Sequence, residues 1–200
     1  MQYSVMLACP ASFFRKDSRQ AEMTDNVVLP MNSLVIIRQI KESDAEEFLS
    51  LCMAVDAETP FMMFEPGERP TKIQEQRDEI RDILSRENQT IFVAENNGQL
   101  IGYLTACGGR YKRNKQTVYI ITGILRGFTS QGIGTKLFQE MERWAKEKEI
   151  HRLELTVAVH NKAALALYRK MGFEIEGRKK HSLLINNCYV DEYLMAKLLS

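Results

Sequence analysis

Hydrophobic and polar residues follow two different spacings along the chain, and the spacing changes repeatedly between residues 34 and 199. Short runs of β-branched and apolar residues predict strands, whereas apolar residues three and four positions apart predict helices. The predicted strands are residues 34–40, 90–95, 99–107, 117–125, 152–159, 173–185 and 188–199. The predicted helices begin at Ser43 and Thr71 and cover residues 134–149 and 161–171.

Turn and capping residues separate these blocks. Asn97-Gly98 and Asn186-Asn187 lie between strand pairs, and Asn-Gly in particular is typical of a tight hairpin turn, in which both central residues have positive φ. Ser43 with Glu46 three residues later predicts a capping box at the first helix. Gly172 is expected to end the last helix.

The resulting order, β-α-α-β-β-β-α-β-α-β-β, combines a hairpin-rich first half with a βαβ-like second half. This combination predicts an α/β fold with a mixed sheet rather than an all-parallel one. Residues 1–32 show neither spacing, so we expect a loosely held N-terminal arm there. Residues 33–200 are long enough for a single domain and too short for two.

Composition narrows the class of protein. The chain is 44% hydrophobic and 26% charged with a net charge of +1, which gives no basic field to indicate nucleic acid binding. No apolar run reaches the length of a membrane span, and the first residues lack the features of a secretion signal, so we expect a cytoplasmic protein. The four cysteines form no CxxC pair and no zinc-type spacing with histidine, so we expect no metal.

A glycine-rich turn, Gln131-Gly132-Ile133-Gly134-Thr135, joins a predicted strand to a predicted helix. A helix N-terminus carries unpaired N–H groups and partial positive charge, and glycine lets the backbone approach a phosphate closely. A dinucleotide-binding loop would need glycine at Leu137, and a Walker loop would need lysine at Ile133. The acyl-CoA pattern Gln/Arg-x-x-Gly-x-Gly/Ala fits except at Thr129. By itself the turn is equally consistent with glycines that only shape the backbone.

The segment Asn161–Phe173 reads Asn-x-x-Ala-x-x-Leu-Tyr-x-Lys-x-Gly-Phe. Here the chain resembles the GNAT superfamily of N-acetyltransferases, whose second signature has this pattern. The resemblance extends from about Leu34 to Leu199, and the ending Tyr189–Met195 is similar to polyamine and ribosomal-protein acetyltransferases. It implies a mostly antiparallel central sheet flanked by helices, with acetyl-CoA as co-substrate.

The resemblance also implies roles for individual residues. Main-chain groups of Ile124 and Leu125 would hold the pantetheine arm and orient the acetyl carbonyl. Tyr168 would protonate the departing CoA thiolate, a role that its normally protonated hydroxyl supports; the alternative is a core aromatic residue. The remaining residues implied to contact the cofactor are Gln131, Gly132, Gly134, Thr135, Asn161 and Ala164.

The general base is less defined. Some protein-acetylating relatives carry a glutamate five residues before the motif asparagine, where this chain has Thr156. Glu154, two residues earlier on the same strand face, is a candidate base, with a cross-strand ion pair as its alternative role and a water chain as an alternative base. The segments 58–70 and 181–187 are expected to flank the acceptor groove, with the carboxylates of Glu58, Glu65 and Glu68 and the apolar residues 61–64.

Together these features predict an enzyme that transfers acetyl directly from acetyl-CoA to a primary amine in a ternary complex. The amine would belong to a small molecule, a polyamine or a protein N-terminus. The alternative is a non-catalytic acyl-CoA-binding module that senses the cofactor. An edge strand in the last predicted hairpin would allow pairing between subunits in a homodimer.

Overall fold

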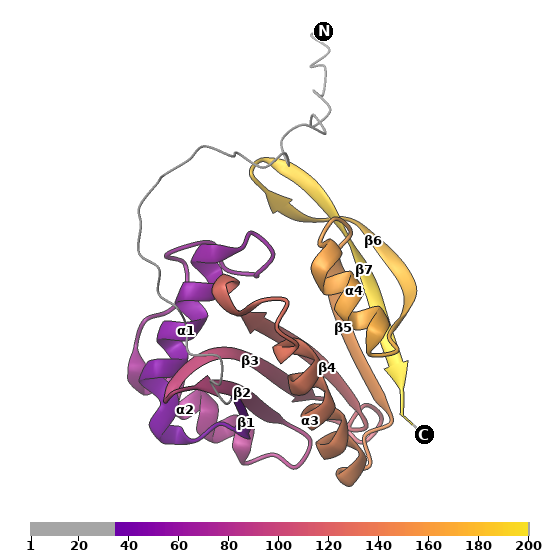
Figure 1. The fold of residues 1–200 in the computed structure, drawn as a ribbon. Coiled ribbons are helices and arrows are strands. Elements are labelled where there is room, and N and C mark those ends of the chain that lie inside the picture. The colour runs from indigo at the N-terminus through magenta and orange to yellow at the C-terminus, as the bar shows by residue number, and fades with distance from the viewer. Residues whose placement is uncertain (1–34, 200) are drawn as a thin grey trace, which may run out of the picture.

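The computed structural model describes residues 35–199 and places a seven-stranded sheet at the centre of the molecule (Figure 1). The predicted arm, residues 1–32, lies outside these residues. All predicted helices and strands are present in the predicted order. Their bounds are β1 Ile36–Gln39, α1 Ala45–Glu58, α2 Ile73–Leu84, β2 Thr90–Asn96, β3 Gln99–Gly108, β4 Thr117–Ile124, α3 Ile133–Glu147, β5 Arg152–Ala158, α4 Lys162–Lys170, β6 Glu174–Ile185 and β7 Cys188–Leu198, with short 3₁₀ turns η2 Glu42–Asp44 and η3 Arg126–Phe128.

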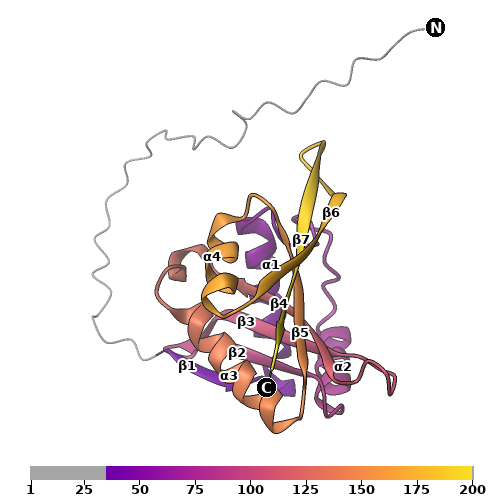
Figure 2. The same ribbon diagram turned by 90° about the vertical axis from the view of Figure 1, so that its right-hand side faces the viewer.

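The strands follow the order β1-β2-β3-β4-β5-β7-β6. Among the described strands, only β4 and β5 run parallel, and every other neighbouring pair is antiparallel. This confirms the expected α/β class with a mixed, mostly antiparallel sheet. Strand β6 forms one edge of the sheet, and Figure 2 shows its hairpin with β7 extending beyond the other elements. Pairing of this edge in a homodimer stays a prediction.

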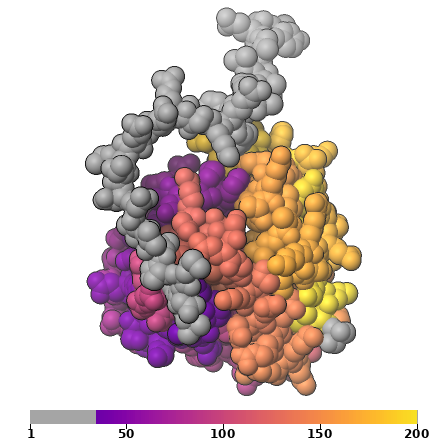
Figure 3. All heavy atoms as spheres, in the orientation of Figure 1, coloured from indigo at the N-terminus to yellow at the C-terminus, as the bar shows by residue number. Residues whose placement is uncertain are grey.

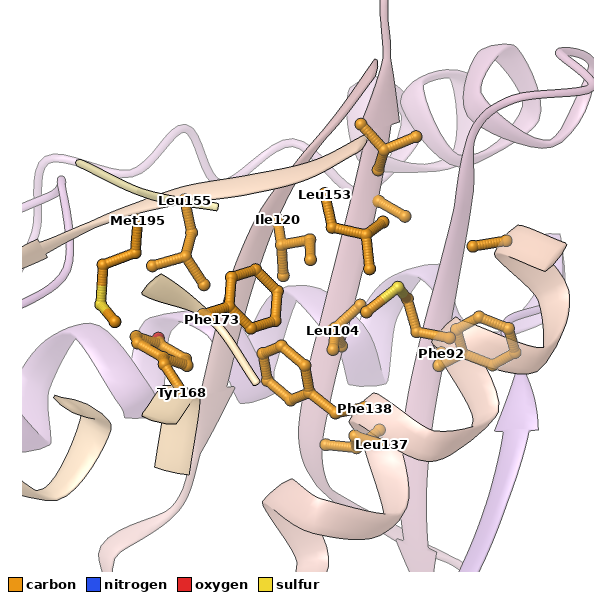
Figure 4. Close-up of a cluster of buried hydrophobic side chains, with 14 of the residues drawn as sticks. Phe92, Leu104, Ile120, Leu137, Phe138, Leu153, Leu155, Tyr168, Phe173 and Met195 are labelled. Carbon is orange, nitrogen blue, oxygen red and sulfur yellow. The ribbon is translucent and has the colours of Figure 1, made fainter. Parts of the chain in front are cut away.

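Helices cover both faces of the sheet because each helix buries one apolar stripe. The larger core lies under α3 and α4, whose residues Leu137, Phe138 and Tyr168 pack against strand residues such as Leu104 and Leu153 (Figure 4). A second core lies under α1 and α2 on the opposite face. Its buried members include Phe48, Cys52, Val55, Ile80, Ile83 and Tyr103. Within residues 35–199, no helix combines the length and hydrophobicity needed to span a membrane.

The local turn chemistry accounts for the hairpins. Asn97 and Gly98 have φ values of 51° and 81°, and Asn186 and Asn187 have 50° and 59°, so both predicted turns have two central residues with positive φ. The capping prediction at α1 was wrong. The chain enters α1 through the turn η2, and the residue before α1 is Asp44, whose carboxylate accepts the Lys41 N–H at 2.8 Å at the start of η2 and makes no capping bond to α1.

Candidate active site

The parallel strands β4 and β5 pair over a short stretch and then diverge. Pairing joins Thr117 to Arg152, Val118 to Leu153 and Tyr119 to Glu154, and stops there. Beyond Tyr119, β4 continues to Ile124 in contact with β3 alone, whereas β5 continues to Ala158 in contact with β7 alone. Figure 1 shows the two strands separating, with α4 beside β5. We call this opening the β4–β5 divergence.

Main-chain groups of β4 face the β4–β5 divergence. The Leu125 N–H donates to the Ile101 carbonyl at 3.0 Å, so this pair is a hydrogen-bonded pair of the antiparallel ladder. Hydrogen bonding alternates along such a ladder, so the preceding pair, Ile124 and Gly102, directs the Ile124 N–H and C=O away from β3. The predicted main-chain role is therefore open to Ile124, whereas the N–H of Leu125 is already used inside the sheet.

Strand β5 provides the opposite wall in the same way. The Val159 N–H donates to the Asp191 carbonyl at 3.0 Å, which marks this pair with β7 as hydrogen-bonded. By alternation, the main-chain groups of Thr156 and Ala158 point toward β4. The divergence is thus bordered on both sides by peptide groups that have no neighbouring strand to bond among residues 35–199.

The glycine-rich turn lies at the start of α3. Gly132 is the residue before the first turn of α3 and has φ of 80°, a conformation that glycine adopts without strain. A Cβ atom added to Gly132 would meet no atom within 4 Å, so the backbone there faces open space. A helix N-terminus with accessible N–H groups suits a phosphate or pyrophosphate.

Two side chains brace this turn from within. The Thr129 hydroxyl donates to the Arg126 carbonyl at 2.9 Å, and the Gln131 amide donates to the Gly127 carbonyl at 3.0 Å. Thr129, the one mismatch to the acyl-CoA pattern, therefore stabilises the turn through its own hydroxyl. The Gln131 side chain is likewise committed to the loop, so only its main chain is left for a ligand.

Gly134 brings the start of α3 into close contact with α4. A Cβ atom on Gly134 would lie 2.7 Å from Cδ2 of Leu167 and 3.5 Å from Cδ1 of Ile124. The glycine therefore allows three elements of the site, namely α3, α4 and the end of β4, to meet. Lys170 of α4 adds a second link, because its ammonium donates to the Thr135 hydroxyl at 3.2 Å. In the space-filling view, η3 and α4 border a furrow on this face (Figure 3).

Asn161 has a structural task at the start of α4. Its side-chain oxygen accepts the Ala164 N–H at 3.2 Å, which makes it the N-cap of the helix. This bond occupies the Asn161 oxygen and the N–H of Ala164. The amide NH₂ of Asn161 is the group through which the predicted contact with pantetheine would be made.

Tyr168 lies on α4 inside the larger core (Figure 4). Its ring packs against Phe138 and Phe173, with centroid distances of 5.6 and 6.2 Å. Burial raises the pKa of the Tyr168 hydroxyl above its ordinary value, and nearby Tyr119 raises it further. The hydroxyl is therefore protonated at neutral pH, as a proton donor must be. Tyr168 is thus a core aromatic residue, which was the alternative interpretation, and its role as proton donor to the CoA thiolate stays a prediction.

The opposite face of the divergence carries groups that sequence patterns did not identify. Tyr119 and Thr156 reach across it, with their hydroxyl oxygens 2.7 Å apart. Glu154, the predicted base, lies at the closed end, where its carboxylate accepts the Arg152 guanidinium at 2.9 Å. The alternative role anticipated for Glu154 was a cross-strand ion pair, whereas the partner found is Arg152 of the same strand, and the role of Glu154 as base stays a prediction. No group of three or more potential metal ligands occurs within residues 35–199.

The loop between α1 and α2 borders this face. Phe61 packs against His160, which follows β5, with ring centroids 5.1 Å apart. The expected acidic residues have other partners: Glu58 accepts the Arg126 N–H at 2.5 Å, and Glu68 accepts the Glu65 N–H at 2.8 Å. Two of the three carboxylates expected to attract an amine thus hold loops in place.

A substitution at Gly132 tests the glycine-rich turn. Gly132→Val is expected to weaken acetyl-CoA binding about 30-fold or more, because the β-branched side chain opposes positive φ and would project into the space before α3. Isothermal titration calorimetry measures the effect. Gly67→Val, at a positive-φ glycine in the α1–α2 loop that also has open space around it, is the matched control. Equal losses of affinity in both variants would remove the turn from the binding site.

Comparison with protein families and curated proteins gives a consistent result. The model of the acetyltransferase (GNAT) family matches residues 54–173. The L-amino acid N-acetyltransferase AaaT of Escherichia coli is 34% identical over 111 residues, which cover 54% of this chain and 67% of that enzyme. The N-alpha-acetyltransferase RimI of Mycobacterium tuberculosis is 30% identical over 118 residues, which cover 58% of this chain and 70% of that enzyme.

Solved structures share the fold over most of the chain. An acetyltransferase of the GNAT family from Streptococcus pneumoniae superposes with a TM-score of 0.80 and 29% identity, covering 84% of this chain and all of that one. The structure of yncA from Salmonella typhimurium, a putative acetyltransferase with its cofactor acetyl-CoA, gives a TM-score of 0.74 at 17% identity over 83% and 94% of the two chains.

Proposed function

Because this chain belongs to the GNAT family of acetyltransferases, we propose that it moves an acetyl group from acetyl-CoA directly to a primary amine held in the same complex. The observation that carries the proposal is the β4–β5 divergence. It has the Gly132 turn and Tyr168 on one side and the α1–α2 loop on the other. Such an arrangement lets the two substrates enter from opposite faces and meet between the strands.

Several of the predicted residues have a task in this proposal, whereas Leu125, Ala164 and Glu154 have none. The N–H groups at the start of α3, from Gly132 to Thr135, bind the pyrophosphate, and the Asn161 amide holds the pantetheine arm. The Ile124 N–H stabilises the negative charge that develops on the carbonyl oxygen when the amine attacks. Tyr168 gives its proton to the leaving thiolate. Direct transfer draws much of its rate from holding amine and thioester in contact.

A panel of amines with detection of free CoA thiol tests this function. The panel contains amino acids, polyamines, aminoglycosides and peptides with free N-termini, since the relatives named above include an amino acid acetyltransferase and an N-alpha-acetyltransferase. Thiol release that depends on both substrates, with intersecting initial-rate patterns, supports direct transfer. Parallel patterns would instead indicate an acetylated enzyme intermediate and would contradict it.

The non-catalytic acyl-CoA-binding module remains the alternative function. Such a module would keep the α3 turn and would need no proton donor at Tyr168. The same panel distinguishes the two functions, provided that acetyl-CoA binding is measured in parallel. Tight binding without turnover on any amine would favour the module.

A further inference from the structure

A buried carboxylate lies on the acceptor side of the β4–β5 divergence. Glu192 belongs to β7 and is 6% exposed. It pairs with Ala158 of β5 and with Lys179 of β6. Side chains alternate along a strand, so Glu192 points away from the core that holds Met195, and toward the face that also carries Thr156.

The environment of Glu192 keeps it charged. Burial alone would raise its pKa, but the hydroxyl of Thr156 and the ammonium of Lys179 favour the charged form and outweigh burial, so the pKa of Glu192 lies below its ordinary value. The Lys179 ammonium contacts Oε2 at 3.1 Å and is itself 54% exposed. A buried carboxylate held in this way is an ionised proton acceptor at neutral pH.

Hydrogen-bond polarity connects Glu192 to the β4–β5 divergence. Thr156 and Glu192 are diagonal neighbours on one face of the paired strands β5 and β7, and an ionised carboxylate only accepts hydrogen bonds, so the Thr156 hydroxyl is the donor in this pair. The Thr156 oxygen then accepts the Tyr119 proton across the 2.7 Å contact between the two hydroxyls. This order leaves the oxygen lone pairs of Tyr119 free to accept a hydrogen bond from a ligand.

Tyr119 stands at the apex of the divergence, because its pair with Glu154 is the last between β4 and β5. Its neighbours Val118 and Ile120 belong to the core under α3 and α4, so Tyr119 points to the other face. Tyr168 lies on the core side of the sheet, and the presence of Tyr119 raises the pKa of its hydroxyl. The charged groups on the Glu192 face of the neighbouring strands are Lys179 and Glu176 on β6 and Glu154 and Arg152 on β5, with Arg152 paired to both glutamates.

We propose that Glu192 is the proton acceptor of the reaction, and that it receives the proton of the acceptor ammonium through Tyr119 and Thr156. This inference rests on the proposed function and names its missing base. The ammonium gives one proton to the Tyr119 oxygen, Tyr119 gives its own to Thr156, and Thr156 gives its own to Glu192. The neutral nitrogen then forms the C–N bond, and the C–S bond breaks as Tyr168 protonates the sulfur. The second proton of the nitrogen restores Tyr168, and Glu192 releases its proton to solvent.

The test compares Glu192→Gln with the unaltered enzyme on an amine that the enzyme acetylates. At pH 7 the expected loss in kcat/KM is about 100-fold. The pH dependence should change as well: the residual kcat/KM of the variant rises about tenfold per pH unit up to the pKa of the free amine, because only amine already neutral in solution can react. The unaltered enzyme should show no such slope around neutrality. The defect should shrink for an acceptor amine with a low pKa.

Four further variants complete the test. Thr156→Val and Tyr119→Phe break the relay without removing the charge, so both should show the same slope and retain thermal stability close to that of the unaltered protein. Asp191→Asn removes a similar ion pair between β7 and β6, with Arg178 at 2.6 Å, and should keep the original pH profile.

Glu154→Gln tests whether the carboxylate first predicted from sequence is the base. A slope in that variant, or a loss in Glu192→Gln that is equal at every pH and for every amine, would overturn the proposal. Absence of any turnover by the unaltered enzyme would instead reject the proposed function itself.

Discussion

Replacing Tyr168 with phenylalanine is expected to lower kcat about 1000-fold while leaving the Kd for acetyl-CoA within about twofold. The ring of Tyr168 is buried against Phe138 and Phe173, and phenylalanine preserves that packing. Only the hydroxyl proton is lost, so the leaving thiolate would depart unprotonated. Because the pKa of Tyr168 lies above its ordinary value of about 10, its hydroxyl stays protonated throughout the range below that value. Deprotonation of Tyr168 should therefore cause no loss of activity in that pH range.

Pre-steady-state release of CoA thiol, with saturating amine, measures the effect on the chemical step. Tyr193→Phe is the matched control, because Tyr193 packs partly buried against the same core and has no assigned role. A kcat for Tyr168→Phe equal to that of Tyr193→Phe, with chemistry shown to be rate-limiting, would remove Tyr168 from the mechanism. The position would then be a purely structural one.

Replacing Arg69 with methionine is expected to lower the free energy of unfolding by about 3–5 kcal/mol and the Tm by about 10 °C. The Arg69 guanidinium contacts both carboxylate oxygens of Asp56, at 2.6 and 3.1 Å, and lies 4.5 Å from the centroid of the Phe64 ring. The Asp56 side chain is only 2% exposed. Removing Arg69 leaves a charge in the core under α1 and α2 without its partner, which is the costly way to break a buried ion pair.

Thermal and urea unfolding measure this loss, and a double-mutant cycle locates its origin. The combined change Asp56→Leu with Arg69→Met removes both charges, so it should recover most of the stability lost in Arg69→Met alone. Additive losses in the double variant would show that the two side chains do not depend on each other. They would contradict the conclusion that the loss in Arg69→Met comes from leaving the Asp56 charge unpaired.

Local sequence patterns predicted the elements well, since their causes are local. Apolar spacing set α3 and α4, and residues able to take positive φ at Asn97 and Gly98 set a hairpin. The error at Ser43 has a local cause too: Ser43 lies inside a 3₁₀ turn that precedes α1, so Asp44 and not Ser43 is the residue before the helix. A capping motif read from spacing alone does not include such a turn.

Sequence motifs indicated residues for the cofactor side of the candidate site and gave little for the side proposed to hold the acceptor. Gly132 and Tyr168 belong to continuous motifs and can be recognised one segment at a time. Tyr119, Thr156 and Glu192 come from three different strands, and only the sheet register brings them together. The sequence did mark Thr156 as the position where relatives carry a glutamate. It did not show that the register of β5 with β7 places a buried carboxylate, Glu192, on the same face as that threonine.

The walls of the β4–β5 divergence are peptide groups at Ile124, Thr156 and Ala158, and their direction is fixed by ladders with β3 and β7. Substitution of side chains leaves these groups in place as long as the strands keep their register. Most of the surrounding residues can therefore be substituted during evolution while these main-chain groups keep their positions. A structure with acetyl-CoA bound that keeps the same fold at 17% identity is the outcome that such mutational tolerance predicts. The face proposed to hold the acceptor is lined by side chains such as Tyr119 and Thr156 instead, so we expect a change of amine specificity to need substitutions on that face.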